Sequence, residues 1–312
     1  MQIPIIDFHP FLTTGDSTAK EAVAAQISLA IHEVGCFYLK NYGISQSLIA
    51  QLFSQTESFF ALPEQEKEQV SFFPDRNLRG YHNFKKSEDK HNANELMTEG
   101  FHFGKEITLD EVGIIEDPFF EPNKWPENPA HFREVMLEFF TGCHESALKV
   151  FQALAISLRI PEDYFTNLYS EQNHGIVLHH YPSIYQPPEL GKVYLAEHTD
   201  IGTLTFLFQD SEGLEVYTNA GEWVVAPFVP DAIIVLVADL MQRWTNDKFG
   251  ATRHRVIVPT QSHSAKQRYS CAFFTGPNYD ASINSIKTCL EIDEVPKYPP
   301  ILAQEYFKQP KG

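Results

Sequence analysis

The sequence of 312 residues predicts an α+β fold that is mainly β, with a jelly-roll core and an N-terminal helical region packed around it. Two patterns lead to this prediction. Apolar residues recur at helical spacing in the first 170 residues, and short runs rich in Val, Ile, Tyr, Phe and Thr follow Gly175. Long helices do not separate these runs, which favours an antiparallel sandwich or jelly roll over an alternating α/β sheet. We therefore expect residues 1–170 and 171–312 to form one integrated domain.

Helical spacing is clearest in three stretches of the N-terminal region. Residues 22–34, 48–60 and 132–158 each carry apolar side chains that would share one face of a helix. Residues 72–128 combine Gly, Pro, Asn and charged residues without a sustained period, which predicts surface loops long enough to cover an active site. Near the other end of the chain, residues 302–307 predict a short closing helix.

Eight strand-like runs follow Gly175, separated by clusters of Gly, Pro, Asn and Asp. They are IVLHHY, VYLAEH, TLTFLF, LEVY, EWVVA, AIIVLVA, RHRVIV and RYSCAFF. Their short length and close spacing are typical of antiparallel strands joined by turns, and they predict the jelly-roll core.

The charge of the chain restricts its partners. Lys and Arg total 24 against 41 Asp and Glu, so the formal net charge of −17 disfavours nucleic acid and anionic membranes as partners. The same charge favours a neutral or cationic small-molecule substrate, although an acidic composition also serves solubility alone.

Targeting and redox signals point to a cytoplasmic protein. The first residues, MQIPIIDFHPFL, lack a basic segment followed by a long apolar run, and no stretch of 18 apolar residues occurs in the chain. Cys36, Cys143, Cys271 and Cys289 are scattered without a C-x-x-C pair, so we expect buried thiols in a reducing compartment.

A possible metal site begins with the triplet His198-Thr199-Asp200. On an extended strand its imidazole and carboxylate would point to the same side. The triplet alone is weak support, because 13 His and 41 acidic residues make one or two such triplets expected by chance. His254, in a second strand-like run, completes the two-His, one-carboxylate set that binds Fe(II) and leaves positions open for a cosubstrate and O2. The alternative is that each residue is an ordinary strand-end, turn or core residue.

The strand-like run RYSCAFF carries a second candidate site. Alternation places Arg268, Ser270 and Phe274 on one face of the strand. An Arg binds a carboxylate with two parallel hydrogen bonds, and the hydroxyl of Ser270 can add a third, so this face suits a 2-oxoacid cosubstrate with a second carboxylate. The alternative is a surface Arg on an edge strand.

Together these segments resemble the isopenicillin N synthase-like family of 2-oxoglutarate and Fe(II)-dependent dioxygenases, over nearly the whole chain. IPIIDF and GCFYLKNYGI resemble the N-terminal region of the family, and HHYP, HTDIGTLTFLFQD, GLEV, ADLMQRWTN and TRHRV with RYS resemble its catalytic core in the same order. The resemblance implies a double-stranded β-helix, that is, a jelly roll, and the two regions would then form one catalytic domain.

The resemblance also implies roles for individual residues. The iron ligands would be His198, Asp200 and His254, and the 2-oxoglutarate site would contain Arg268, Ser270 and Tyr181. Phe274 matches an aromatic residue of the substrate pocket, although a Phe on a strand is also a common core residue. His179 and His180 depart from the family's more frequent Asn-Tyr at these positions, which leaves the hydrogen bonding around the cosubstrate open.

The substrate-binding residues are expected in the segments that vary within such a family. The candidates are the segment 79–104, with His102 and Phe103 foremost, and a C-terminal segment around Tyr306 and Phe307. Each of these residues is equally well explained by packing of a loop on the barrel.

The activity implied by the resemblance is hydroxylation of an unactivated C–H bond of a small molecule, with Fe(II), 2-oxoglutarate and O2, and release of succinate and CO2. Such an enzyme would suit natural-product biosynthesis, with an alkaloid toxin among the possible substrates. The presence of Asp200 argues against halogenation, because family halogenases replace this carboxylate with a small residue. Desaturation, ring closure and oxidase chemistry on the same scaffold remain alternatives, as does a catalytically silent ligand-binding protein.

Overall fold

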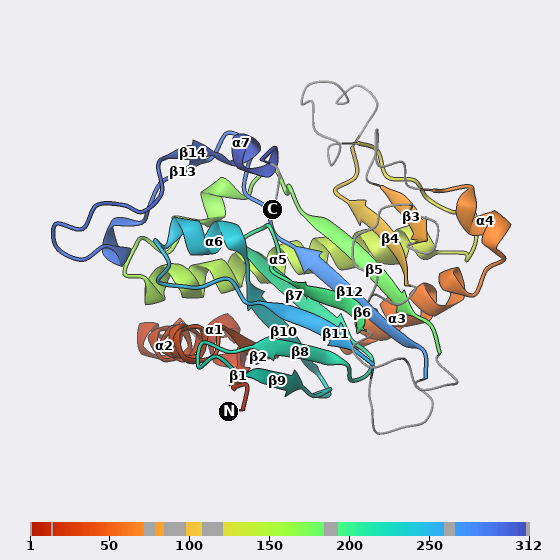
Figure 1. Ribbon diagram of the computed structural model, residues 1–312, viewed down its shortest axis with the longest axis horizontal. Helices are drawn as coiled ribbons and strands as arrows, with labels where there is room; N and C mark the ends of the chain where they lie inside the picture. The colour runs from red at the N-terminus through yellow and green to blue at the C-terminus, as the bar shows by residue number, and fades with distance from the viewer. Residues whose placement is uncertain are drawn as a thin grey trace.

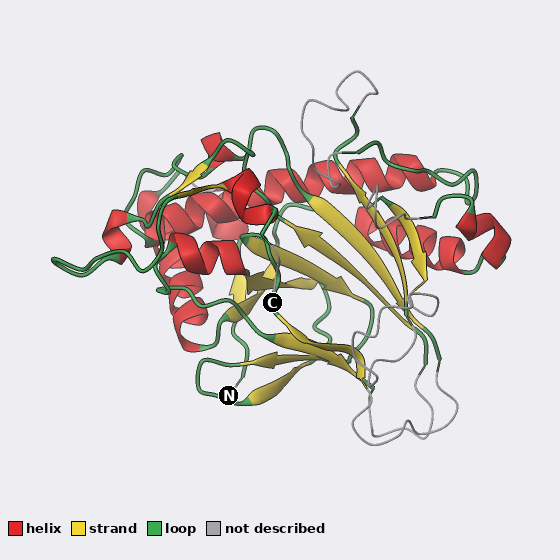
Figure 2. Cartoon of the chain, turned by 45° about the horizontal axis from the view of Figure 1, so that its top comes forward, coloured by secondary structure: helices red, strands yellow, loops and turns green. Residues whose placement is uncertain are grey.

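The computed structural model describes residues 2–13, 15–71, 79–83, 98–107, 121–183, 193–258 and 266–309. Two facing sheets form its core, and helices cover the outer side of the larger sheet (Figures 1 and 2). This arrangement is the predicted jelly roll. None of the helices in the described part of the chain combines the length and the apolar character that crossing a lipid bilayer requires.

The larger sheet has eight strands, which are antiparallel except for the pair β1 and β2. Their order across the sheet is β1 (Ile5–Asp7), β2 (Cys36–Lys40), β10 (Ala232–Val237), β7 (Leu204–Gln209), β12 (Arg268–Phe274), β5 (Gly175–Tyr181), β4 (Glu99–Gly104) and β3 (Gly80–Asn83). The smaller sheet has the order β6 (Val193–His198), β11 (His254–Ile257), β8 (Leu214–Tyr217) and β9 (Trp223–Ala226). All eight strand-like runs after Gly175 are therefore strands, as predicted.

The helices lie on the outer face of the larger sheet. They are α1 (His9–Thr13), α2 (Ser17–Glu33), α3 (Gln46–Phe60), α4 (Glu64–Glu68), α5 (Phe132–Ser157), α6 (Asp239–Trp244) and α7 (Ala303–Phe307), with short 3-10 turns at Thr166–Leu168 and Lys287–Cys289 and a small hairpin of β13 (Ser282–Ile283) and β14 (Ile301–Leu302). The predicted helices at 22–34, 48–60, 132–158 and 302–307 correspond to α2, α3, α5 and α7.

Side-chain oxygens cap the N-termini of two of these helices. The carboxylate of Asp16 accepts a hydrogen bond from the backbone N–H of Thr18 at the start of α2, and the hydroxyl of Ser45 accepts one from Leu48 at the start of α3. Each bond satisfies one of the N–H groups that a helix start leaves without a partner.

Aromatic residues join the helices to the sheet. On α5, Phe139 packs edge-on against Phe208 of β7, with the ring centroids 4.9 Å apart, and Phe140 packs against Phe273 of β12. A second apolar cluster lies between the two sheets, and it includes Leu207, Leu236, Leu214 and Val256. Odd and even residues of the same strands thus belong to different layers, which is the alternation that a half-buried strand requires.

The prediction of surface loops for residues 72–128 was wrong at two places. Residues Gly80–Asn83 and Glu99–Gly104 are the strands β3 and β4, which extend the larger sheet beyond β5. GYHN shows no apolar alternation, and in EGFHFG only Phe101 and Phe103 alternate with glycine and histidine, which is too short a pattern to indicate a strand from the sequence alone. Residues 72–78, 84–97 and 108–120 lie outside the described part of the chain.

The N-terminal region also supplies β1 and β2, which the sequence pattern had not revealed. Residues 1–170 therefore contribute four strands to the sheet that carries β5, β7, β10 and β12 of the C-terminal region. The thiols are all free, with three of them buried and Cys289 half-buried.

Candidate active site

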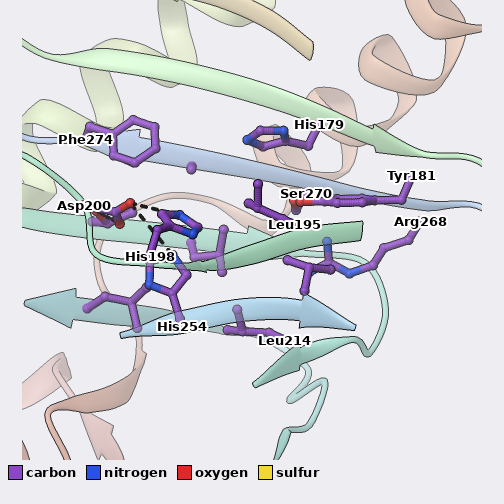
Figure 3. Close-up of a pocket in the computed structure, with 15 residues that line it drawn as sticks. His179, Tyr181, Leu195, His198, Asp200, Leu214, His254, Arg268, Ser270 and Phe274 are labelled. Atoms are coloured by element: carbon purple, nitrogen blue, oxygen red, sulfur yellow. Dashed lines mark hydrogen bonds and ion pairs between the residues drawn. The ribbon is translucent and has the colours of Figure 1, made fainter. Parts of the chain in front are cut away.

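A pocket lies between the two sheets of the jelly roll, and both sheets supply polar side chains to it. It contains about 390 Å³ of space free of atoms, partly open to solvent. The lining residues are His179, Tyr181, Leu195, His198, Asp200, Thr205, Leu207, Leu214, Leu236, His254, Val256, Arg268, Ser270, Ala272 and Phe274. Figure 3 shows the group of His198, Asp200 and His254 toward one end of the pocket and Arg268 and Tyr181 at the other.

The candidate metal-binding group is formed by the smaller sheet and the turn that follows β6. His198 ends β6, and His254 begins β11 directly opposite it in the antiparallel register. Nε2 of His198 lies 3.6 Å from Oδ1 of Asp200, and Nε2 of His254 lies 3.8 Å from the same oxygen. One ligand atom from each residue falls within 4.8 Å of the others, which suits a single metal ion. Two imidazoles and one carboxylate are the ligand set of non-haem Fe(II) oxygenases.

The remaining polar atoms of this group are held by the protein. Nδ1–H of His198 donates to the carbonyl oxygen of Ala196 at 2.9 Å, and Nδ1–H of His254 donates to that of Thr252 at 3.0 Å. The hydroxyl of Thr205 donates to Oδ2 of Asp200 at 2.6 Å. These bonds fix the tautomer of both rings, so that Nε2 of each ring and Oδ1 of the carboxylate are directed at the metal position.

Burial favours the neutral form of the His254 ring, which is the form that binds a metal. Loss of solvent lowers the pKa of His254, and the attraction of Asp200 offsets this only in part. The neutral imidazole is the form that coordinates a metal, so the site requires no deprotonation of this ring at neutral pH.

The turn after Asp200 is held against the end of β12. A Cβ atom on Gly202 would collide with the carbonyl oxygen of Thr275, so only glycine permits this approach. The backbone N–H of Thr203 donates to the same carbonyl at 2.9 Å, and the N–H of Asp239 donates to the carbonyl of Asp200 at 2.8 Å. Asp200 is therefore positioned by the backbone of two other elements.

The other end of the pocket carries Arg268, which is only 4% exposed. Its Nη2 donates to Oε1 of Gln209 at 3.1 Å, and its guanidinium carbon lies 4.8 Å from the centre of the Tyr181 ring. Tyr181 is the direct neighbour of Arg268 in the register of β5 and β12. The side chain is thus fixed on two sides before any ligand binds.

Two buried polar atoms at this end have no hydrogen-bond partner within the described part of the chain. They are Nη1 of Arg268 and Oγ of Ser270, and Ser270 is 1% exposed. An unpaired buried donor typically costs about 1–3 kcal/mol, and more when it is charged. A carboxylate placed here would accept from both atoms. The arrangement therefore fits the far carboxylate of a dicarboxylic cosubstrate.

The consecutive histidines of β5 have opposite orientations. His179 lines the pocket, where its ring stacks against Tyr181 with centroids 5.8 Å apart, and burial lowers its pKa to about 3. His180 faces the helices, and its Nδ1 lies 2.7 Å from Oε2 of Glu99. Only the first of the two departures from the family pattern therefore reaches the pocket.

The structure separates the three substrate candidates. Phe274 lines the pocket. His102 pairs with Val177 of β5, which places it on the pocket-facing side of β4. It does not line the pocket itself. Phe103 is fully buried on the opposite face, among the aromatic residues under the helices, so a role in binding substrate does not fit its position. The two C-terminal candidates also pack in this core: Tyr306 is buried in it, and Phe307 is partly buried against it.

Thr205 and Gln209 are site residues that sequence reasoning missed. Both lie on β7, where alternation puts them on the same face as Leu207. A Thr and a Gln on the inner face of a fully buried strand need hydrogen-bond partners. Their presence in the apolar run TLTFLFQ could therefore have indicated polar partners inside the barrel.

The geometry agrees with comparisons to known proteins. Residues 3–128 match the family model described as non-haem dioxygenase in morphine synthesis N-terminal, and residues 172–277 match the model of the 2OG-Fe(II) oxygenase superfamily. A 2-oxoglutarate-Fe(II) type oxidoreductase, ppzD, of Metarhizium majus is 30% identical over 99% of this chain and 94% of its own length. The chain belongs to the 2-oxoglutarate and Fe(II)-dependent oxygenases.

Two further similarities extend over almost the full length. The proline hydroxylase buaE of Petromyces alliaceus is 32% identical over 96% of this chain and 94% of its own length. The crystal structure of a full-length Neurospora crassa protein in complex with alpha-KG and thymine has a TM-score of 0.86 at 31% identity, covering 97% of this chain and 94% of that one. This oxygenase thus uses Fe(II), 2-oxoglutarate and O2, and its His-Asp-His group fits the iron site.

Proposed function

We propose that this oxygenase hydroxylates a C–H bond of a small molecule, with iron held by His198, Asp200 and His254. The observation that carries the proposal is the position of the unpaired Nη1 of Arg268 and Oγ of Ser270 in the pocket that also holds the His-Asp-His group. One cosubstrate molecule with a carboxylate at each end could bind the His-Asp-His group through its metal at one end and Arg268 with Ser270 at the other.

The division of labour between protein and cofactor follows from these positions. Bound iron supplies the oxidising chemistry, in which 2-oxoglutarate and O2 give succinate and CO2 and one oxygen atom enters the substrate C–H bond. Arg268 and Ser270 bind the far carboxylate, and Tyr181 keeps the guanidinium in place. Leu195, Leu214 and other apolar residues of the pocket exclude water from the reacting groups.

The substrate in this proposal is a neutral or cationic small molecule, and nucleic acid is not a partner, because the chain carries a net charge of −17. The similar Neurospora crassa protein was crystallised with thymine, and buaE is named a proline hydroxylase, so small heterocycles and amino acids are the first classes to test. We place the enzyme in natural-product biosynthesis and in the cytoplasm, where its four free thiols would stay reduced.

The test is release of succinate from 2-oxoglutarate, measured with Fe(II) and with Fe(II) removed by a chelator, across a panel of small amino acids and heterocycles. Mass spectrometry of the product separates the outcomes. Gain of one oxygen atom supports hydroxylation, whereas loss of two hydrogen atoms would identify a desaturase or ring-closing enzyme. Binding of 2-oxoglutarate without succinate release for any compound would favour the silent ligand-binding protein.

A further inference from the structure

Thr205 lies on the wall of the pocket beside the metal-binding group. In the sheet register, Thr205 of β7 lies opposite Leu236 of β10 and Phe274 of β12, and all three residues line the pocket. Thr205 is 2% exposed. Its branched Cβ allows few rotamers, and the side chains opposite it on both neighbouring strands restrict it further. The direction of its hydroxyl is therefore set by the larger sheet.

The two oxygens of the Asp200 carboxylate have different surroundings. Oδ1 is the oxygen that lies 3.6 Å from Nε2 of His198 and 3.8 Å from Nε2 of His254. Oδ2 accepts the hydroxyl hydrogen of Thr205 at 2.6 Å, a distance typical of a hydroxyl that donates to an ionised carboxylate. One oxygen thus faces the metal position, and the other is held by β7.

The orientation of this carboxylate depends on Thr205. Backbone contacts fix the turn that carries Asp200, but rotation about the last side-chain bond of an aspartate has a broad energy minimum. Among the residues that the structure describes, the hydroxyl of Thr205 is the single hydrogen-bond donor to the carboxylate. Without this donor, no described residue would keep Oδ2 turned away from the metal position.

The number of carboxylate oxygens on the metal affects what else the metal can bind. A carboxylate coordinates a metal ion through one oxygen or through both. When two imidazole nitrogens and one carboxylate oxygen bind iron, positions remain open for the cosubstrate and O2. A second oxygen from Asp200 would occupy one of these positions.

We propose that Thr205 is a positioning residue that restricts Asp200 to one metal-binding oxygen and so keeps a position open for 2-oxoglutarate. The proposal rests on the hydroxylase function proposed above and gives cosubstrate binding a further determinant, at the metal end of the pocket. Thr205 acts on the cosubstrate through Asp200, whereas Arg268 and Ser270 bind the far carboxylate directly.

The experiment measures Fe(II) binding and 2-oxoglutarate binding separately, on the full chain and without oxygen. Fe(II) is titrated into metal-free enzyme, and 2-oxoglutarate is titrated into enzyme saturated with Fe(II). Thr205→Val keeps the shape of the side chain without the hydroxyl, and Thr205→Ser keeps the hydroxyl. If the valine variant does not fold, Thr205→Ala takes its place in the same two titrations.

Thr218→Val is the matched control. Thr218 is also 2% exposed, and its hydroxyl donates to the carbonyl oxygen of Glu222, outside the pocket. This variant removes a buried threonine hydroxyl without touching Asp200, so it should bind both Fe(II) and 2-oxoglutarate as the wild type does.

The expected result is that the two affinities of Thr205→Val change in different ways. Its affinity for 2-oxoglutarate falls at least about 10-fold, the factor that corresponds to one hydrogen bond with a charged group, because the released oxygen of Asp200 competes for the open position. Its affinity for Fe(II) rises or stays within about 3-fold of wild type, because the carboxylate gains a metal-binding oxygen. Thr205→Ser keeps both affinities.

Three results would overturn the role of Thr205. They are an affinity of Thr205→Val for 2-oxoglutarate within about 3-fold of wild type, a parallel loss of both affinities, which is the mark of a purely structural residue, and a Thr205→Ser variant that behaves like Thr205→Val. Wild-type enzyme that binds Fe(II) but not 2-oxoglutarate would instead count against the hydroxylase function. The wild-type titrations therefore distinguish failure of the function from failure of the positioning role.

Discussion

The two faces of β4, β5 and β12 differ in how well their buried polar groups are hydrogen-bonded. On the face under the helices, Glu99 is bound by Lys67 at 2.6 Å, by His180 at 2.7 Å and by the hydroxyl of Tyr81. On the face toward the pocket, Arg268 and Ser270 keep buried atoms without a partner in the described part of the chain. A buried carboxylate with three hydrogen-bond partners stabilises the fold. Buried donors that have no partner within the protein lower its stability, and they remain available to a ligand.

The difference holds between direct sequence neighbours. His179 and His180 are adjacent, and so are Arg268 and Tyr269, yet one of each pair lines the pocket and the other packs under α3. The comparison therefore predicts that substitutions on the pocket face change ligand binding with little effect on stability, and that substitutions on the helix face do the reverse.

The largest effect is expected from His198→Ala. Removing one of three ligands should lower turnover by at least about 1,000-fold, because the metal contributes several kcal/mol to the reaction. Fe(II) affinity, measured anaerobically by titration, should fall as well. His32→Ala, on the exposed side of α2, is the control and should bind Fe(II) normally. Unchanged Fe(II) affinity in His198→Ala would show that the group is not the metal site.

Arg268→Lys tests the opposite end of the pocket. A lysine keeps the charge but loses the paired hydrogen bonds, so the KM for 2-oxoglutarate should rise by about 100-fold while Fe(II) affinity stays the same. Steady-state succinate release measures the KM. Arg255→Lys is the matched control, because Arg255 pairs with Glu215 on the smaller sheet and does not line the pocket. A KM within about 3-fold of wild type, on the order of measurement scatter, would place the far carboxylate elsewhere.

Ser270→Ala separates binding from stability. Loss of one hydrogen bond to a charged group should raise the KM for 2-oxoglutarate by roughly 10-fold. Without ligand, the variant should be more stable by about 1 kcal/mol, because an unpaired buried hydroxyl is removed. Denaturant unfolding measures this free energy. Ser285→Ala removes another buried hydroxyl that lies outside the pocket and has no partner among the described residues, so it should show a similar stability gain with an unchanged KM.

Glu99→Gln should have the smallest effect on catalysis. Burial raises the pKa of Glu99, but hydrogen bonds from His180, Lys67 and Tyr81 outweigh burial and lower it to about 2, below the ordinary 4.5. The carboxylate therefore stabilises the fold above pH 4.5, and this contribution of roughly 3 kcal/mol is lost as the pH falls toward 2.

The variant should lose that stability at neutral pH and show a flatter pH dependence of unfolding between pH 4.5 and 2, with a KM for 2-oxoglutarate within about 2-fold of wild type. Glu106→Gln, at a more exposed ion pair with Arg133, should change stability by less than about 1 kcal/mol. A large rise in KM for Glu99→Gln would mean that the two faces of the sheet are coupled.

Residue order and spacing alone predicted much of this molecule. The eight strands after Gly175 and the three long helices follow from their apolar periods, because periodic burial is written directly into the sequence. The residues of the iron group and the RYS run were also identifiable, since few side chains bind iron or carboxylates and alternation on a strand shows which of them point the same way.

The tertiary structure decided what local periodicity cannot express. Strand β3 lacks an apolar alternation and β4 has only the two alternating residues Phe101 and Phe103, so it is the pairing of β4 with β5, and of β3 with β4, that makes them part of the sheet. Phe103 and His102 are neighbours on opposite faces for the same reason, because the register of β4 places one under the helices and the other on the pocket-facing side. The hydrogen bond from Arg268 to Gln209 joins residues 59 positions apart in the chain, and such a contact exists only once the strands have paired into the sheet.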